Sequence, residues 1–367
     1  MDFGKTQISF SEEQAMLLDA AQSMCADLSP IDKVRSLLED DKGYDENAWQ
    51  QMVDMGWTGL ALPESVGGSD FGLGALVPLF ESMGKKLLST PLMSTVLAGE
   101  CLRRTGDSAA HSFLEQIAAG AKATLAFVEA DDWGAKSLST RIENGRLQGA
   151  KRHVADAADA AVLVIPAMRE GVKVLALVRG DQLDFACRSN HDVLDATRRA
   201  QSITLDIAEA DITVITGDVG RALEETQLIG ALLVAAESTG AAVSCLNVVV
   251  DYLKTRKQFG KLIGSYQALK HPSVDILCAI ESSKSLIYQA ATELRADALS
   301  RDARIACHMA KSKASETLIF AGDRAVQFHG GMGFTYECDA QLYLRRGLWA
   351  QQAFGDPMHH RKRLAAL

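Results

Sequence analysis

The sequence predicts an α+β protein with three domains. These are an N-terminal α-helical domain (residues 1–120), a middle antiparallel β-barrel domain (121–217) and a C-terminal four-helix bundle (218–367). Two observations predict this order. Apolar residues recur at helical spacing in the first and last parts of the chain, whereas the middle holds short apolar runs rich in β-branched residues. A chain of 367 residues also favours two or three domains over one small core.

The N-terminal part begins with "SEEQAMLLDAAQSMCADL", where Ser11 is a suitable N-cap for a helix. "DENAWQQMVDMG" predicts a second helix that stops at Gly56. A turn-rich loop (62–74) follows, and three further helical segments extend to Gly120. In the middle part, Asn144-Gly145 separates two strand-like runs and is a strong hairpin signal. Six or seven strands without intervening helices favour a barrel or sandwich.

From about residue 220 the helical pattern returns and lasts to the end of the chain. The first segment reads as one helix of roughly 30 residues, far above the usual length of about 11. Two long helices (264–296 and 301–327) and a shorter one (about 336–352) follow. Long helices with short connections predict a four-helix bundle.

Composition excludes several classes of protein. The formal net charge is −9, which disfavours nucleic-acid binding. The seven cysteines are scattered and form no Cys-x-x-Cys pair, so we expect neither a disulfide framework nor a metal site. The polar N-terminus does not resemble a signal peptide, and we expect no membrane span. These observations predict a soluble protein of the cytoplasm.

Two short stretches are candidate sites. Arg256-Lys257-Gln258-Phe259-Gly260 follows the first long helix, and its ordinary interpretation is a basic helix end with Gly260 as C-cap. The functional alternative is a phosphate clamp, because arginine offers a planar fork of donors. Gly330-Gly331-Met332-Gly333 is either an interhelical turn or a place where bare backbone approaches an anion. No strand precedes it, so it is not a dinucleotide fingerprint.

Three longer motifs resemble the acyl-CoA dehydrogenase family. "YLKTRKQFGKLIGSYQALKHPSVDI" (252–276) is similar to the family's Arg-x-x-Phe-Gly segment, and "AVQFHGGMGFTYECD" (325–339) to its Gln-x-x-Gly-Gly-x-Gly segment. "MGWTGLALPESVGGSDFGL" (55–73) is similar to its Gly-Trp-x-Gly stretch, which runs on to Pro-Glu-x-x-Gly-Gly. The motifs occur in the family's order, and the resemblance covers nearly the whole chain.

The resemblance implies FAD as cofactor and an acyl-CoA thioester as substrate. It implies that Arg256 neutralises the pyrophosphate with Gln258 beside it, and that Phe259 and Ile263 pack near the flavin. Gln327 and the backbone of Gly330 and Gly331 would hold the ADP portion, with the two motifs coming from neighbouring subunits. It further implies a homo- or heterotetramer and an electron-transfer flavoprotein as acceptor. The family's reaction removes hydrogens from Cα and Cβ, for which a base and a polarised carbonyl are required.

The glutamate that serves as the catalytic base in the resembled family is missing from this sequence. The usual glutamate position aligns with Gly355, and the alternative position on the first long helix aligns with Gly230. Glu237 lies two helical turns after Gly230 and could replace the base, or it could be a structural ion-pair partner. Asp356 is adjacent to the lost position, although Pro357 redirects the chain there.

The middle domain also departs from the family pattern. "FVEADDWGAKS" (127–137) replaces the flavin-facing Thr-Glu-Pro segment, and His153 occupies the position of an aromatic residue over the flavin. "FGDPMHHR" (354–361) resembles subunits of heterotetramers that degrade steroid side chains. Three hypotheses remain open: a dehydrogenase subunit whose base comes from a partner, an active homomer using Glu237, or a non-oxidising scaffold or desulfinase-like lyase. The sequence does not specify the acyl group.

Overall fold

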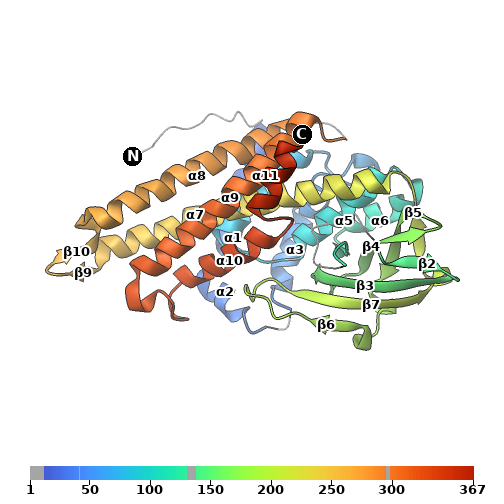
Figure 1. Cartoon of the computed structure of the whole chain (residues 1–367), viewed down its shortest axis with the longest axis horizontal. Helices are drawn as coiled ribbons and strands as arrows, with labels where there is room; N and C mark the ends of the chain where they lie inside the picture. Colours follow the sequence, from blue (N-terminus) through green and yellow to red (C-terminus); the bar gives the residue numbers. More distant parts are fainter. Residues whose placement is uncertain (1–11, 41, 130–137, 295–297) are drawn as a thin grey trace.

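The structure is a computed structural model that describes residues 12–40, 42–129, 138–294 and 298–367. Its elements follow the predicted order of helices, sheet and helices, and the sheet lies at the opposite end from the tip of the long helices (Figure 1). The predicted N-cap Ser11 and part of the segment 127–137 lie outside the described residues. The exact domain boundaries remain a prediction.

The N-terminal helices pack around the first half of the bundle. Their bounds are α1 Glu12–Leu28, α2 Ile31–Ser36, α3 Glu46–Asp54, α4 Leu76–Lys85, α5 Leu92–Thr105 and α6 His111–Ala118. Gly56 follows α3 with a φ of 72°, a left-handed conformation that favours glycine, so the predicted stop is confirmed.

The predicted closed antiparallel barrel is wrong, because the sheet is open and mixed. Its strands are β1 Ala123–Leu125, β2 Arg141–Glu143, β3 Arg146–Ala155, β4 Val162–Arg169, β5 Val172–Arg179, β6 Arg188–Asn190, β7 Ala200–Ala208 and β8 Thr213–Ile215. The strand order is β6-β7-β3-β2-β4-β5-β8, with β1 added beside β4. Both β1 and β2 pair with β4 in parallel.

Helices cover one face of this sheet, whereas on the other face residues of β2, β3, β4, β5 and β7 pack against one another. Successive side chains of β4 point to opposite faces. Val162 and Val164 belong to the core shared with α5 and α6, whereas Leu163 and Ile165 belong to the core on the other face. The outermost strands β6 and β8 have only three residues each, which limits exposed edge pairing.

The predicted hairpin is confirmed. Glu143 pairs with Arg146 across a two-residue turn, and both turn residues, Asn144 and Gly145, have positive φ values of 53° and 71°. These are the angles that a type I′ turn requires, which explains the Asn-Gly sequence.

The C-terminal part is built on α7, a helix of 37 residues (Val219–Thr255). The others are α8 Gln267–Glu293, α9 Arg301–Phe328, α10 Ala340–Gln352 and α11 Pro357–Ala365. Among the described residues, α7 alone is long and apolar enough to cross a membrane, but 89% of its most apolar window is buried inside the chain. Such burial is typical of a core helix.

Glycines allow α4 and α7 to approach closely. A Cβ added at Gly84 would lie 2.0 Å from the carbonyl oxygen of Glu237, and one added at Gly240 would lie 1.9 Å from that of Glu81. Each helix therefore presents bare backbone to a carbonyl of the other, and this contact fixes the position of Glu237 in the core.

Gly260 is not the C-cap of α7. The helix ends at Thr255, and the chain then forms a small hairpin of β9 (Lys257–Gln258) and β10 (Lys261–Leu262). Phe259 and Gly260 are its two turn residues, with φ values of 52° and 74°. The glycine serves a tight turn beyond the helix rather than its termination.

Candidate cofactor and reaction sites

The two glycine-containing motifs lie together at one end of the bundle. The ring of Tyr252, in the last turn of α7, stacks on His329, at the end of α9, with ring centroids 4.2 Å apart. Arg256 comes a few residues after Tyr252, and Gln327 comes shortly before His329. One chain therefore supplies both motifs. The antiparallel helices α7 and α9 return the chain to the same end, and the expectation that neighbouring subunits each supply one motif to a shared cofactor stays a prediction.

The donor groups at this end are accessible. Arg256, Gln258 and Gln327 are exposed. Within the described part of the chain, no hydrogen bond or ion pair is found for the Arg256 guanidinium. Gly330 has a φ of 61°, and a Cβ added at Gly330 or Gly331 would meet nothing within 4 Å. The backbone here is thus open to an approaching ligand.

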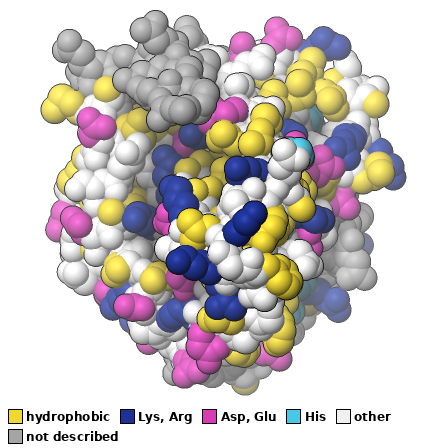
Figure 2. All heavy atoms as spheres, turned by 90° about the vertical axis from the view of Figure 1, so that its left-hand side faces the viewer, with side chains coloured by type: hydrophobic (Ala, Val, Ile, Leu, Met, Phe, Trp, Pro, Cys, Tyr) yellow, Lys and Arg dark blue, Asp and Glu magenta, His cyan; other side chains and the backbone are white. Residues whose placement is uncertain are grey.

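Apolar side chains surround these donors. Phe259 is 84% exposed, and Met332, Phe334 and Tyr336 are more than half exposed, whereas Ile263 is buried in the core of the bundle end. Figure 2 views this end of the molecule, where Lys and Arg side chains gather between hydrophobic ones. An arginine for which no ion pair is found among the described residues, open backbone and exposed aromatic rings suit an anionic aromatic ligand. We call residues 256–262 and 327–334 the nucleotide tip.

The two positions that align with the family's catalytic base, Gly230 and Gly355, are closed by neighbouring side chains. Gly230 lies on α7 and Gly355 in the turn between α10 and α11. A Cβ added at Gly230 would lie 2.7 Å from the ring of Phe354. One added at Gly355 would lie 2.7 Å from the His359 ring, and the φ of Gly355 is 104°. Neither position has space for a carboxylate side chain.

Aromatic rings occupy the place where these two positions meet. Phe354 stacks on Phe127 with centroids 5.6 Å apart and an interplanar angle of 21°. Phe127 comes from the segment after β1 that the family resemblance places beside the flavin. Positions 127, 230 and 354–355, which are distant in sequence, therefore converge on one spot that is closed by apolar groups.

Glu237 is a structural ion-pair partner. It is 2% exposed and accepts hydrogen bonds from both Arg198 and Arg346. Arg346 also donates to Asp195 and Thr197. Although burial opposes ionisation of Asp195, the charges of Arg346 and Arg198 lower its pKa. The Oε1 atom of Glu237 thus balances two buried cations, whereas its Oε2 atom has no hydrogen-bond partner among the described residues.

Asp356 caps a helix. Its carboxylate accepts a hydrogen bond of 2.7 Å from the backbone nitrogen of His359, at the start of α11. Pro357 occupies the first helical position, where its missing N–H costs nothing. The sequence signal for this role was present, since Asp-Pro is a usual start of a helix.

Glu129, in the altered flavin-facing segment, is bound to the sheet. It accepts a 2.5 Å hydrogen bond from Lys151 and others from Ser139 and Thr140. Burial opposes its ionisation, but these hydrogen bonds and the Lys151 charge lower the pKa of Glu129 to about 2. His153 stacks on His191 at 4.4 Å within the same sheet. Both residues serve the sheet in this structure.

Sequence reasoning missed a buried basic cluster beneath the 353–356 turn. Lys311 of α9 is fully buried and donates to the carbonyls of Ala350 and Gly355 at 3.0 and 2.8 Å. His360 contacts the Phe354 carbonyl at 3.0 Å and His308 at 2.8 Å. Burial lowers the pKa of Lys311 to about 7. No sequence motif marks this cluster, because a lone lysine on an apolar helix face has no characteristic spacing.

Asp156 is a second carboxyl that sequence patterns did not reveal. It follows β3, has a φ of 52°, and accepts a 2.6 Å hydrogen bond from the Ser94 hydroxyl. Burial raises the pKa of Asp156 to about 6, although Ser94 and the Arg198 charge act in the opposite direction. Its position anchors the sheet to α5.

The fold combines N-terminal helices, a mixed sheet and a helical bundle whose tip presents an exposed arginine, open glycine backbone and aromatic rings. Comparison with known proteins gives the family. Residues 11–121 match the acyl-CoA dehydrogenase N-terminal domain, and residues 221–366 match the acyl-CoA dehydrogenase C-terminal domain. The chain belongs to the acyl-CoA dehydrogenase family, whose members are FAD-dependent flavoproteins.

Full-length relatives agree with this assignment. The chain is 30% identical to the acyl-CoA dehydrogenase IpdE2 of Mycolicibacterium smegmatis, covering 97% of this chain and 99% of the relative. A Tcur3481–Tcur3483 steroid ACAD variant has a TM-score of 0.83 at 25% identity over 97% of each chain. The ChsE4–ChsE5 complex from Mycobacterium tuberculosis shares the fold, with a TM-score of 0.84 at 22% identity over 100% of this chain and 98% of the other.

Proposed function

We propose that this chain is one subunit of an FAD-dependent acyl-CoA dehydrogenase that performs α,β-dehydrogenation of an acyl-CoA thioester. In this proposal the chain contributes a nucleotide tip, and a different subunit contributes the catalytic base. The observation that carries the proposal is the closure of both base positions: Gly230 and Gly355 lack a carboxylate, and the surrounding rings leave no space for one.

The residues of the tip suit the ADP half of FAD. Arg256 would neutralise the pyrophosphate, Gln258 and Gln327 would donate or accept hydrogen bonds, and Gly330 and Gly331 would let backbone approach the phosphates. Phe259 is free to lie against a ring, whereas the buried Ile263 would support the hairpin from below. When bound, the flavin accepts the hydride from Cβ of the acyl group.

The residues around Phe354 do not suit the reactive half. The carboxylate of Glu129 is already bound by Lys151, and Phe127 is stacked on Phe354. Removing the weakly acidic α proton requires a positioned base within hydrogen-bond reach. The two sequence candidates, Glu237 and Asp356, are engaged in an ion pair and a helix cap.

The geometry of α7 argues for two chains per flavin. Gly230 and Arg256 are 26 residues apart on one helix, which corresponds to about 39 Å along its axis at 1.5 Å per residue. That separation exceeds the reach of an extended flavin dinucleotide. In this proposal, the tip of one chain therefore faces the reactive pocket of another. A mixed tetramer allows the tip of this chain to serve a pocket that retains its carboxylate.

Two similar structures support such an assembly. The ChsE4–ChsE5 and Tcur3481–Tcur3483 structures are each described as a pair of different chains. A homotetramer, an electron-transfer flavoprotein as acceptor and a cytoplasmic location remain predictions of the family resemblance. The acyl group is not specified by the residues described above.

Co-expression tests the proposal. The chain is purified alone and together with a second acyl-CoA dehydrogenase chain encoded beside it, and FAD content and thioester oxidation are measured. We expect little flavin and no turnover for the chain alone. We expect half a flavin per subunit, with turnover, for the pair.

The alternative hypotheses give different results. One flavin per subunit with turnover by the chain alone would show an active homomer and contradict the proposal. A co-purified pair without any flavin would indicate a scaffold. Flavin without oxidation of any acyl-CoA would favour a non-oxidising enzyme such as a lyase.

A further inference from the structure

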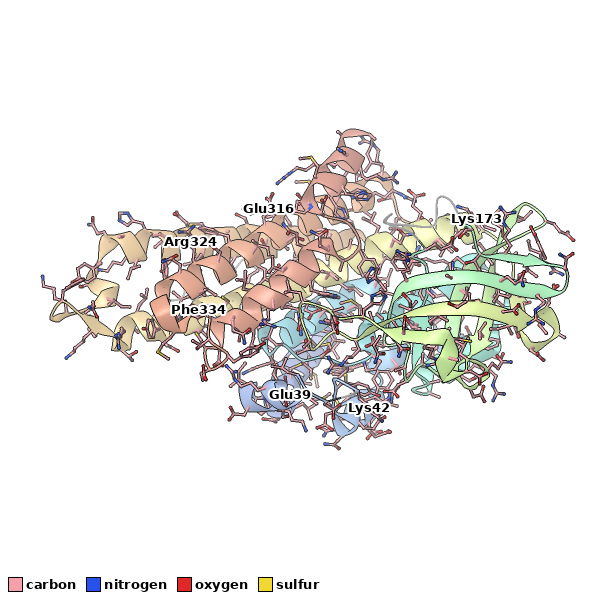
Figure 3. All side chains as sticks on the ribbon, turned by 60° about the horizontal axis from the view of Figure 1, so that its bottom comes forward. Glu39, Lys42, Lys173, Glu316, Arg324 and Phe334 are labelled. Atoms are coloured by element: carbon pink, nitrogen blue, oxygen red, sulfur yellow. The ribbon has the colours of Figure 1, made fainter. Side chains whose placement is uncertain are left out.

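A cavity of about 350 Å³ lies apart from both the nucleotide tip and the Phe354 spot. It is formed where α2, the loop before β7 and α10 meet. Figure 3 shows this side of the molecule, with Glu39 after α2 and Phe334 near the segment that leads to α10. The volume lies at the lower end of the range for small-molecule sites. Its lining is Val34, Arg35, Leu38, Glu39, Leu87, Asp195, Ala196, Thr197, Tyr336, Gln341, Leu342, Arg345 and Arg346.

The cavity contains one cation that lacks a carboxylate partner. Arg346 is bound by Asp195 and Glu237, and Arg35 is bound by Asp339 and the Tyr336 and Glu337 carbonyls. Among the described residues no ion pair is found for Arg345, whose guanidinium lies 5.3 Å from the centre of the Tyr336 ring. Contact with the face of the Tyr336 ring leaves the N–H groups of the Arg345 guanidinium available to an acceptor.

A buried amide is also without a partner at this cavity. Gln341 is 7% exposed, and neither its amide nitrogen nor its amide oxygen forms a hydrogen bond to the described residues. Buried polar groups are nearly always hydrogen-bonded, because leaving one unsatisfied is costly. A polar ligand or an ordered water would provide the missing partner after a small rotation of the side chain.

The remaining lining is apolar. Val34, Leu87 and Leu342 belong to one apolar cluster against which Leu38 packs, and we call these four residues the aliphatic wall of the cavity. Val34 and Leu87 are almost fully buried. Three arginines and two acidic residues, Glu39 and Asp195, give the lining a net charge of one positive. A site of this composition selects a ligand with one anionic head and a compact hydrocarbon body.

We propose that this cavity binds a small amphipathic organic anion, with its carboxylate or phosphate head on Arg345 and Gln341 and its hydrocarbon against the Leu38–Leu87–Leu342 wall. The site is distinct from the proposed dehydrogenation site, because none of residues 256–262, 327–334, Gly230 and Gly355 lines it, although Tyr336 lies between the cavity and the tip in sequence. It lies against the Asp195–Arg346–Glu237 network, so an occupant would contact the charges that hold α7, α10 and the sheet together.

Isothermal titration of the purified full-length protein tests the site. The probes are hexanoate, hexyl phosphate and hexanol, and the variants are Arg345→Gln, Leu38→Trp and Arg146→Gln. We expect one or both anions to bind and hexanol not to bind. Arg345→Gln should weaken anion binding at least tenfold, and Leu38→Trp should abolish it by filling the cavity. Arg146→Gln, on the exposed strand β3, should leave binding unchanged.

The two anionic probes distinguish the head group, because preference for hexanoate assigns a carboxylate and preference for hexyl phosphate assigns a phosphate. Absence of binding by both anions would overturn the proposal, as would equal binding of hexanol or undiminished binding by Arg345→Gln. Thermal unfolding of each variant checks the fold. If Arg345→Gln unfolds, Leu38→Trp, which keeps every charge, decides the question alone.

Discussion

At the residue scale, three acidic side chains at or near the candidate reaction site are engaged in contacts within the fold. Glu237, Asp356 and Glu129 each lie where the sequence allows chemistry, and each is bound by a buried arginine, a helix N-terminus or a buried lysine. Sequence alone could place Glu237 on an apolar helix face but could not reveal its partners. Arg198 and Arg346 are distant in the chain and reach it only through the packing of the sheet and α10.

Glu237→Gln should destabilise the protein strongly. Removing this carboxylate leaves the buried Arg198 without its ion-pair partner and Arg346 with Asp195 as its remaining carboxylate, and breaking such a buried pair costs about 3–5 kcal/mol in comparable cases. Chemical denaturation measures the change. Glu316→Gln, which breaks the exposed pair with Arg361, should change the free energy of unfolding by less than about 0.5 kcal/mol. Equal small losses for both variants would contradict a structural role for Glu237.

Arg256→Ala should abolish flavin retention by the assembled enzyme without lowering its thermal stability. The guanidinium is exposed and unpaired in the described structure, so its only expected contribution is to the pyrophosphate. FAD released by denaturation is quantified after gel filtration. Lys173→Ala, at the far end of the sheet, is the charge-matched control and should retain full flavin (Figure 3). Full flavin content in Arg256→Ala would exclude the clamp.

Asp156 should make stability depend on pH. Its folded pKa of about 6 lies above its ordinary value of 3.8, so the folded state holds the proton more tightly. The free energy of unfolding should therefore fall as pH rises from about 4 to 6, by on the order of 2 kcal/mol, and stay lower above pH 6. Asp156→Asn should remove this decline, whereas Asp211→Asn, in an exposed turn, should not. A decline that persists in Asp156→Asn would rule out this residue as its source.

At the element scale, the sequence predicted which segments are helices and strands. It did not predict whether the sheet closes into a barrel or which residue ends helix α7. The periodic apolar pattern located α7 and the Asn-Gly hairpin, since both are local signals. Barrel closure was predicted wrongly, because covering a sheet with α5 and α6 is a tertiary choice that leaves no trace in strand alternation. Gly260 was misassigned for a related reason: a C-cap and a hairpin turn both require positive φ.

The contact between α4 and α7 gives an element-scale prediction. Gly240→Ala should destabilise the protein by about 1–3 kcal/mol, because the added methyl group would overlap the Glu81 carbonyl. Gly220→Ala, on the same helix, meets nothing within 4 Å and should be neutral or stabilise by up to about 1 kcal/mol. Thermal and urea unfolding of the pair compare the two sites. Similar effects for both would show that helix propensity, and not close approach, governs α7.

At the scale of the whole molecule, the tip and the Phe354 spot lie beside opposite halves of helix α7. The resemblance of the motifs to a known family led to the proposed tip residues, because their expected roles depend on backbone and charge at one place; these roles stay a prediction. It could not predict the aromatic closure, since Phe127 and Phe354 meet only in the folded chain. The composition of the pocket at α2 and α10 could not be predicted either, because its lining comes from four separate stretches of the chain.

The length of α7 also bears on how such proteins diverge. The 37-residue helix α7 connects the tip at its C-terminal end to the Phe354 spot beside Gly230 and holds the two sites apart. After a gene duplication, one copy can lose its proton-abstracting group without penalty, provided its sister keeps one and still needs the first copy's grip on the shared prosthetic group. Each of the two duplicated subunits is then required for the activity of the other, and selection maintains an obligate hetero-oligomer in place of a homo-oligomer.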